Sequence, residues 1–233
     1  MRADTRAFVE DCWAEIFGCG RNDLWVGTQV TGHAGLGEYP GVWVAWRDAG
    51  VHVSLPTTVA PHEAESLATQ GIETLADPAW WSTFAADRGW GLVGPAVHAY
   101  LDEDPGNDGT VSRIDPALLA GLRASVAEDE WHEAGFAAET ADALGCFADG
   151  RLVAAAGFSD FGDAPRDVGL LVASDTRGRG LGHLVGGAAA SYAVRKHGFA
   201  VWRAFVENTA SLAISRALGF EAYCHQLAVR PAR

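Results

Sequence analysis

Lysine is nearly absent from this sequence, and the cysteine and histidine patterns that bind metals are absent. Only Lys196 among the 17 basic residues is a lysine, which excludes the glycine–lysine–serine or glycine–lysine–threonine run of a P-loop. The four cysteines form no CxxC pair or zinc spacing, and no two of the eight histidines stand four residues apart. We expect no metal cofactor, and we interpret the cysteines as reduced, mostly buried thiols of a cytoplasmic protein.

Long apolar runs are also lacking, and basic residues are outnumbered. No run approaches the roughly 20 apolar residues that span a bilayer, and acidic residues occupy the N-terminal region where an export signal needs an apolar core. The 30 acidic and 17 basic residues give a net charge of −13, which disfavours nucleic acid and membrane as partners. We predict a cytoplasmic monomer or homodimer, whose charge either attracts a small cationic partner or only provides solubility.

The chain is expected to divide at a polar, turn-rich stretch, residues 102–110. Seven of the nine tryptophans lie before residue 91, so the composition also changes there. We predict an N-terminal accessory domain over residues 1–104 and a second domain over residues 105–233. Helices and strands are mixed in both, which indicates an α/β fold with a mixed sheet. The first domain is also open to interpretation as a degenerate copy of the second.

The individual elements are predicted from periodicity, caps and turns. In the first half we expect a helix over 3–17, a hairpin over 41–55, helices starting near Pro61 and Pro78, and a strand over 91–103. In the second half we expect a short strand, one helix after Asp115, a hairpin over 143–161, a strand over 166–174, a helix over 181–197, a strand over 200–207, a helix after Asn208 and a strand over 220–229.

The stretch RGRGLG, Arg177–Gly182, joins an apolar strand to the predicted helix over 181–197. A glycine-rich helix start with arginine beside it offers backbone N–H groups and the positive end of the helix dipole to an anion. A dinucleotide-binding fingerprint would need a third glycine where His183 stands. The alternative to an anion site is a tight turn that uses glycine for its dihedral angles.

The sequence GLLVASDTRGRGLG, followed by VENTASLAISRALGF, resembles the two distinctive segments of the GNAT superfamily of N-acetyltransferases, over about residues 111–230. The resemblance implies a GNAT-like acyl-CoA N-acyltransferase fold and acetyl-CoA (coenzyme A) as cosubstrate. It implies that backbone N–H groups of 178–182 hold the pyrophosphate and that the strand edge pairs with the pantetheine arm. The residues implied to bind the cosubstrate are Leu171, Val172, Ala173, Arg177, Gly178, Arg179, Gly180, Leu181, Gly182, Asn208 and Ser211.

Some of these residues carry a more specific expectation. The resemblance implies that a backbone N–H near Val172 polarises the thioester carbonyl. Gly180 and Gly182 would allow the phosphates to approach, since a side chain would push them away. Asn208 would contact the cosubstrate arm, and its other expected role is the N-cap of the following helix, which contributes roughly 1 kcal/mol.

The catalytic positions depart from the family pattern. Many members have a tyrosine seven residues after the asparagine, where this chain has Ser215, a poorer acid than a phenol. Tyr223 is an alternative acid. For the base, Asp167 lies closest to the usual position but one residue out of register, which on a strand turns a side chain to the other face. Other candidates for the base are Glu207, Asp160, His98 and Glu133.

We predict an N-acetyltransferase that moves the acetyl group of acetyl-CoA to a primary amine of a small, cationic molecule or of a protein. No cysteine stands in an activating motif, which favours direct transfer in a ternary complex over a covalent route. One alternative is a non-catalytic acyl-CoA-binding sensor or scaffold. Another is an interaction protein in which the glycine-rich loop is only a turn.

Overall fold

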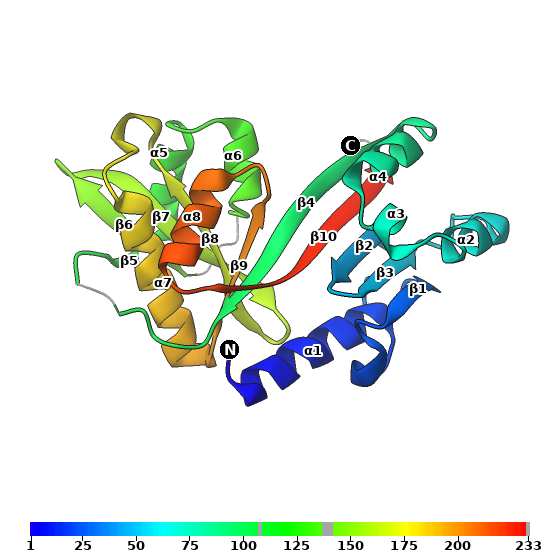
Figure 1. Ribbon diagram of the computed structural model, residues 1–233. Helices are drawn as coiled ribbons and strands as arrows, with labels where there is room; N and C mark the ends of the chain where they lie inside the picture. Colours follow the sequence, from blue (N-terminus) through cyan, green and yellow to red (C-terminus); the bar gives the residue numbers. More distant parts are fainter. Residues whose placement is uncertain (107–108, 137–141, 232–233) are drawn as a thin grey trace. The chain divides into compact units, whose positions relative to one another are not determined.

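The computed structural model describes residues 1–106, 109–136 and 142–231 (Figure 1). Their contacts form two compact units, Ala3–His98 with Tyr223–Arg233 (the 3–98 unit) and Ala99–Ala222 with Met1–Arg2 (the 99–222 unit). The contact boundary falls inside β4 (Trp90–Leu101), whereas the predicted domain boundary falls in the loop that follows it. The domain ranges 1–104 and 105–233 stay a prediction.

The 3–98 unit is a mixed sheet with helices on both faces. Its strand order is β1-β3-β2-β10-β4, with β1 parallel to β3 and the other recorded pairs antiparallel. Valines of the β2–β3 hairpin pack against Leu67, Leu75 and Trp81 of the helices in the main core. The elements are α1 (Ala3–Phe17), β1 (Gly27–Gly32), β2 (Val42–Arg47), β3 (Gly50–Leu55), α2 (Pro61–Ala68), α3 (Ile72–Leu75), α4 (Pro78–Ala86) and β10 (Glu221–Pro231).

Local signals predicted most of this unit. The helix over 3–17 is confirmed, and the hairpin turns at Asp48, whose φ is 49°. The carboxylate of Asp77 accepts the Ala79 N–H at 2.9 Å and so caps α4, with Pro78 as its first residue. Strand β1 was not predicted; it begins and ends with glycine, has three polar residues and only Val30 as an apolar residue between them, and is placed by its pairing with β3.

The 99–222 unit has a sheet in the order β9-β8-β7-β6-β5. Strands β5 to β8 pair antiparallel in sequence, and β9 pairs parallel with β8. Among the helices of residues 1–106, 109–136 and 142–231, none is long and apolar enough to cross a membrane. The elements are β5 (Ser112–Ile114), α5 (Leu119–Arg123), α6 (Glu128–Glu133), β6 (Ala143–Ala148), β7 (Arg151–Phe161), β8 (Ala164–Val172), α7 (Leu181–His197), β9 (Ala200–Phe205) and α8 (Thr209–Ala217).

The prediction of a single helix after Asp115 is wrong, because the chain forms two short helices there, α5 and α6. The hydroxyl of Ser125 donates to the Leu122 carbonyl at 2.7 Å and closes the first helix. The carboxylate of Glu130 accepts the Ala127 N–H at 2.9 Å, which starts the second. This break brings acidic residues of α6 to the site described below.

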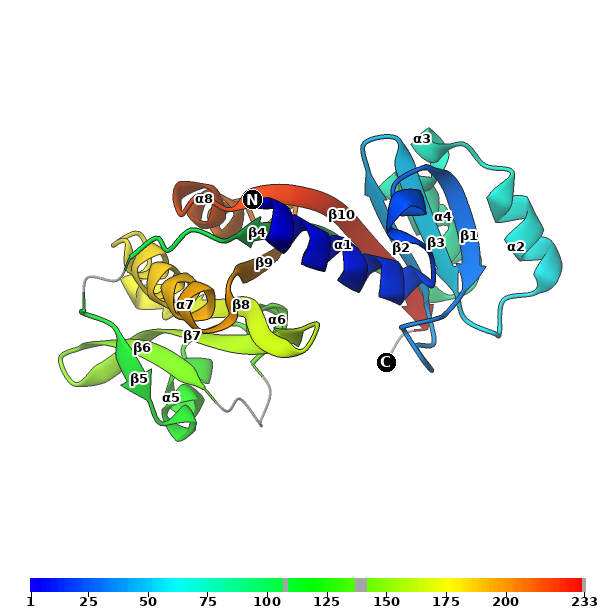
Figure 2. The same cartoon turned by 90° about the horizontal axis from the view of Figure 1, so that it is seen from below.

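Helices cover both faces of this sheet, with α7 on one face and α5 on the other (Figure 2). On the α7 face, a Cβ added to Gly186 would lie 3.0 Å from Trp202 and 3.1 Å from Leu170, so α7 approaches the sheet closely. On the opposite face, Leu171 packs with Leu119 of α5 and with neighbouring apolar residues. Successive residues of β8 therefore face different helices.

Candidate functional site

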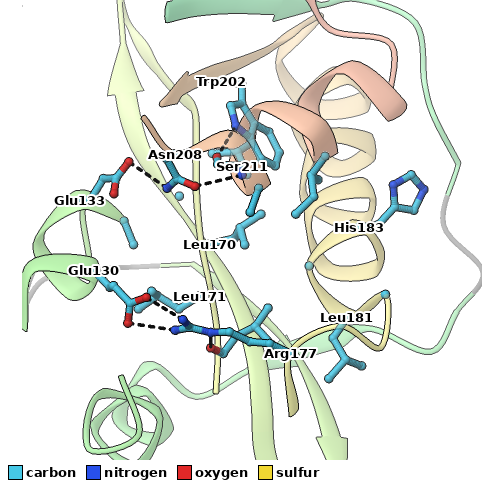
Figure 3. Close-up of a pocket in the computed structure, with 18 of the residues that line it drawn as sticks. Glu130, Glu133, Leu170, Leu171, Arg177, Leu181, His183, Trp202, Asn208 and Ser211 are labelled. Carbon is cyan, nitrogen blue, oxygen red and sulfur yellow. Dashed lines mark hydrogen bonds and ion pairs between the residues drawn. The ribbon is translucent and has the colours of Figure 1, made fainter. Parts of the chain in front are cut away.

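Strands β8 and β9 diverge and open a cavity between them. Asp167 and Val201 form the one register pair recorded between the two strands in the described chain. Beyond that pair, a cavity of about 460 Å³ is lined by Val168 to Val172 of β8 and by Trp202 and Arg203 of β9. Figure 3 shows this space with side chains from α6, α7 and α8 around it. A ligand in it would lie along the free edge of β8.

The backbone of Val172 is turned toward this space. The Ala173 N–H donates to the Val153 carbonyl at 2.9 Å, which makes Ala173 and Val153 a hydrogen-bonded pair of the β7–β8 ladder. Hydrogen-bonded and non-hydrogen-bonded pairs alternate in an antiparallel ladder, so the adjacent pair of Val172 with Ala154 is of the second kind. The N–H and C=O of Val172 therefore point away from β7, toward the side on which the cavity lies.

A glycine-rich turn leads from β8 into α7 at one end of the cavity. Gly178 and Gly180 have φ of 76° and 79°, a left-handed conformation that glycine adopts without strain. Gly180 is the N-cap of α7 and offers no side-chain cap, and the Leu184 N–H bonds to the Gly180 carbonyl. The three N–H groups before Leu184 have no helical acceptor and are available to an anion.

The structure shows further reasons for glycine at Gly180 and Gly182, beside the predicted approach of the phosphates, which stays a prediction. No atom of the described chain lies within 4 Å of a Cβ added to Gly180, and its φ of 79° favours glycine. A Cβ added to Gly182 would lie 2.8 Å from Cδ1 of Ile214 in α8. Gly182 thus allows α7 and α8 to pack closely beside the cavity.

Arg177 lines the cavity but is paired with a carboxylate of α6. Its Nη1 and Nη2 atoms lie 2.7 and 2.9 Å from the two Glu130 oxygens, and its Nε donates to the Val172 carbonyl at 3.2 Å (Figure 3). Two hydrogen bonds lower the pKa of the Glu130 carboxyl, and the one from Arg177 has a larger effect than the one from the Ala127 N–H. Arg179 is exposed and does not line the cavity. The positive charge expected from Arg177 is therefore largely compensated.

Asn208 is held by two partners where β9 leads into α8. Its Oδ1 accepts the Ser211 N–H at 3.0 Å, which confirms the N-cap. Its Nδ2 donates to Oε1 of Glu133 at 3.0 Å, and the Phe205 N–H reaches the same oxygen at 3.5 Å. Ser211 also accepts the Trp202 indole N–H on its hydroxyl at 3.0 Å. Asn208, Ser211, Glu133 and Trp202 all line the cavity.

The two residues predicted to be catalytic lie outside the cavity lining. Ser215 is buried in α8, where its hydroxyl donates to the Leu212 carbonyl at 3.2 Å. The Asp167 side chain is 13% exposed, and its Oδ2 lies 3.3 Å from Nη2 of Arg203. Burial raises the pKa of Asp167, and the Arg203 charge opposes that shift. These catalytic assignments stay predictions.

The remaining candidates are distributed over the chain. Ala173 is fully buried and, like Arg179, is not a lining residue, whereas the other predicted binding residues are: Leu171, Val172, Arg177, Gly178, Gly180, Leu181, Gly182, Asn208 and Ser211. Asp160 and Glu207 are exposed and outside the lining. His98 and Tyr223 belong to the 3–98 unit, where the Tyr223 hydroxyl accepts the Trp25 indole N–H at 2.9 Å. Glu133 is the one candidate base among them that lines the cavity.

Several lining residues were not predicted. Glu130 and Glu133 come from α6, whose start depends on the break after α5, and Glu133 was considered only as a base. Trp202 and Arg203 are consecutive residues of β9 and therefore face opposite sides of the strand. Apolar and basic residues in a strand carry no local signal of a ligand, so these positions were not recognisable from the sequence.

Comparison with protein-family models gives a match of residues 114–220 to the Acetyltransferase (GNAT) family. Residues 114–220 form a GNAT domain. A GNAT acetyltransferase from Colwellia psychrerythraea superposes with a TM-score of 0.50 at 17% identity, over 84% of this chain and 67% of that one. A Drosophila protein gives 0.51 at 18% identity, over 82% of this chain and 74% of that one. These two likenesses show the fold; a search of curated proteins gives no match.

Proposed function

We propose that the GNAT domain transfers the acetyl group of acetyl-CoA to a primary amine. The observation that carries this proposal is the cavity between β8 and β9, with the uncapped start of α7 at one end and the free edge of β8 along its side. An extended thioester with a pyrophosphate fits both features, because a strand edge pairs with amides and a helix start binds anions.

Different groups of the chain would bind the different parts of acetyl-CoA, the acetyl donor. The N–H groups of Leu181, Gly182 and His183 would bind the pyrophosphate, with Gly178 and Gly180 shaping the turn below it. The strand edge at 171–172 would pair with the pantetheine arm. The inward N–H of Val172 would donate to the thioester oxygen, where negative charge develops during acyl transfer.

The acceptor would be the amine of a small cationic molecule or of a protein. The acetyl group would pass to it directly in a ternary complex. The ammonium first loses one proton to solvent, and the neutral nitrogen then forms a bond to the acyl carbon while the C–S bond breaks. The second proton lost from nitrogen goes to the departing sulfur, so that CoA leaves as a thiol. The Glu133 carboxylate lines the cavity, and its hydrogen bonds within the described residues come from two neutral donors, the Asn208 amide and the Phe205 N–H. A carboxylate in this position would attract an ammonium group.

Calorimetric titration with acetyl-CoA tests the donor assignment, with 3′-dephospho-CoA and ATP as comparison ligands. His183→Glu adds a negative charge to the first turn of α7, where it favours the helix but repels a pyrophosphate. We expect acetyl-CoA affinity to fall by roughly tenfold or more while thermal stability holds. Ala79→Glu, an exposed position in the first turn of α4, is the matched control. Equal affinity in His183→Glu and wild type would contradict the pyrophosphate site.

A non-catalytic acyl-CoA sensor is the second candidate. It is favoured by the placement of Asp167 and Ser215 outside the cavity lining, which leaves no predicted acid in it. Turnover distinguishes the two candidates. Donor binding with release of CoA thiol in the presence of an amine supports the transferase, whereas donor binding without release under any amine supports the sensor.

A further inference from the structure

The side chain of Arg203 projects from the face of β9 that α6 covers. Partners in a parallel register lie on the same face, so Asp167 and Val201 share one, and alternation adds Gly169 and Arg203 to it. A Cβ added to Gly169 would lie 1.8 Å from the Ala134 carbonyl oxygen, just after α6, which identifies this face. Trp202 and Leu170 point the other way, toward α7.

The Glu133 carboxylate and the Arg203 guanidinium therefore both line the cavity on this face. Oε1 of Glu133 lies 3.5 Å from the Phe205 nitrogen, and Arg203 is two residues before Phe205 on the same strand. Two strand residues span about 6.6 Å. Both Glu133 and Arg203 line the cavity, so one anionic and one cationic side chain stand within reach of a single small molecule.

Within the described residues, the ion pair of Arg203 uses one nitrogen of its guanidinium group. Its side chain is 47% exposed, and its recorded ion pair is a single contact of Nη2 with Asp167 at 3.3 Å. A guanidinium carries five N–H donors in a planar fork that matches a carboxylate. Arg177, by comparison, uses both terminal nitrogens on Glu130.

We infer that the acceptor is an amino acid: a molecule with a carboxylate close to its amine, the carboxylate bound by Arg203 and the ammonium by Glu133. This inference rests on the proposed function. A polyamine would place a cation against Arg203, which costs energy in a partly desolvated cavity. A phosphate dianion would place a second negative charge beside the Glu133 carboxylate and near the Asp167 carboxylate that pairs with Arg203, so a singly charged carboxylate is the better match.

The experiment compares acceptors that differ only in the anionic group. Acetylation of lysine, lysinamide and cadaverine, and of glycine, glycinamide and phosphoethanolamine, is followed by release of CoA thiol. We expect kcat/KM for the amino acids to exceed that for their amides roughly 10- to 100-fold, the range of a hydrogen-bonded charge. Equal or greater turnover of the amides, cadaverine or phosphoethanolamine would overturn the inference.

Variants separate this inference from the donor assignment. Arg203→Gln should remove the preference for the carboxylate while acetyl-CoA affinity, measured by calorimetry, stays unchanged. Arg203→Lys should restore part of it. Arg151→Gln is the matched control, because Arg151 is a strand arginine, 50% exposed, with a single carboxylate partner and no place in the cavity lining. A preference that survives in Arg203→Gln, or donor binding without turnover of any amino acid tested, refutes the inference; absence of donor binding refutes the proposed function itself.

Discussion

Replacing Glu130 with glutamine should tighten acetyl-CoA binding. Glu130 holds both terminal nitrogens of Arg177 at the turn where the pyrophosphate is proposed to lie. A pyrophosphate approaching that turn meets a compensated arginine and a nearby carboxylate of its own sign. Glutamine removes the charge but keeps the size of the side chain and an oxygen for the Ala127 N–H, which starts α6.

The size of the effect follows from the exposure of the pair. The Arg177 and Glu130 side chains are 45% and 35% exposed, so solvent screens the ion pair and its contribution is about 0.2–1 kcal/mol. Release of Arg177 to the ligand then tightens binding by roughly 1.5- to 5-fold. The gain should shrink as salt is raised from 0.05 to 0.5 M, because both interactions are screened.

Calorimetry measures this gain with a control from the same helix. Glu128 pairs with Arg123 at 2.6 Å but does not line the cavity, so Glu128→Gln should leave affinity unchanged. Acetyl-pantetheine, which has no pyrophosphate, should bind wild type and Glu130→Gln alike. Weaker acetyl-CoA binding by Glu130→Gln would refute the reasoning, since Glu130 would then position Arg177 for the ligand instead of competing for it.

Two further predictions concern stability. Gly169→Ala should destabilise the fold by about 1–3 kcal/mol in denaturant unfolding, because its Cβ would meet the Ala134 carbonyl, whereas Gly91→Ala, with nothing within 4 Å, should be near neutral. Asp167→Asn should stabilise the protein at pH 7. The folded-state pKa of Asp167 is raised, because burial disfavours the charged carboxylate. The stability that the protonated carboxyl allows is therefore fully present below the unfolded-state pKa and is lost as pH rises through the folded-state pKa. The gain should therefore be smaller at pH 4; a gain that grows on acidification would contradict the direction of the shift.

Features set by neighbouring residues were predictable from the sequence. The turn at Asp149 and Gly150 has φ of 50° and 76°, as an Asp-Gly hairpin turn requires. The helix Leu181–His197 begins and ends at the predicted residues, between glycines of positive φ. Asn208 caps α8 through an atom three residues away. Each of these depends on a few consecutive residues, whose preferences are visible without the rest of the chain.

Features that depend on distant contacts were not predictable. Glu130 reaches Arg177 across 47 positions and Glu133 reaches Asn208 across 75, and no local pattern records either distance. The orientation of Asp167 depends on the register of β8 with β9, which is a property of two strands. The glycine loop was therefore recognisable from the sequence, whereas the acidic side of the cavity required the structure.

The place of β10 in the sheet of the 3–98 unit has a consequence for the order in which the chain can fold during synthesis. Leu227 of β10 pairs with Val44 of β2, so this pairing can form only after a residue 183 positions later (227 − 44) has been synthesised. The 99–222 unit, by contrast, is almost continuous in sequence. Pairing at such separation is slow, because a long loop must close first. On a ribosome, the part of the sheet that is made first would be completed last, after the GNAT domain has left the exit tunnel.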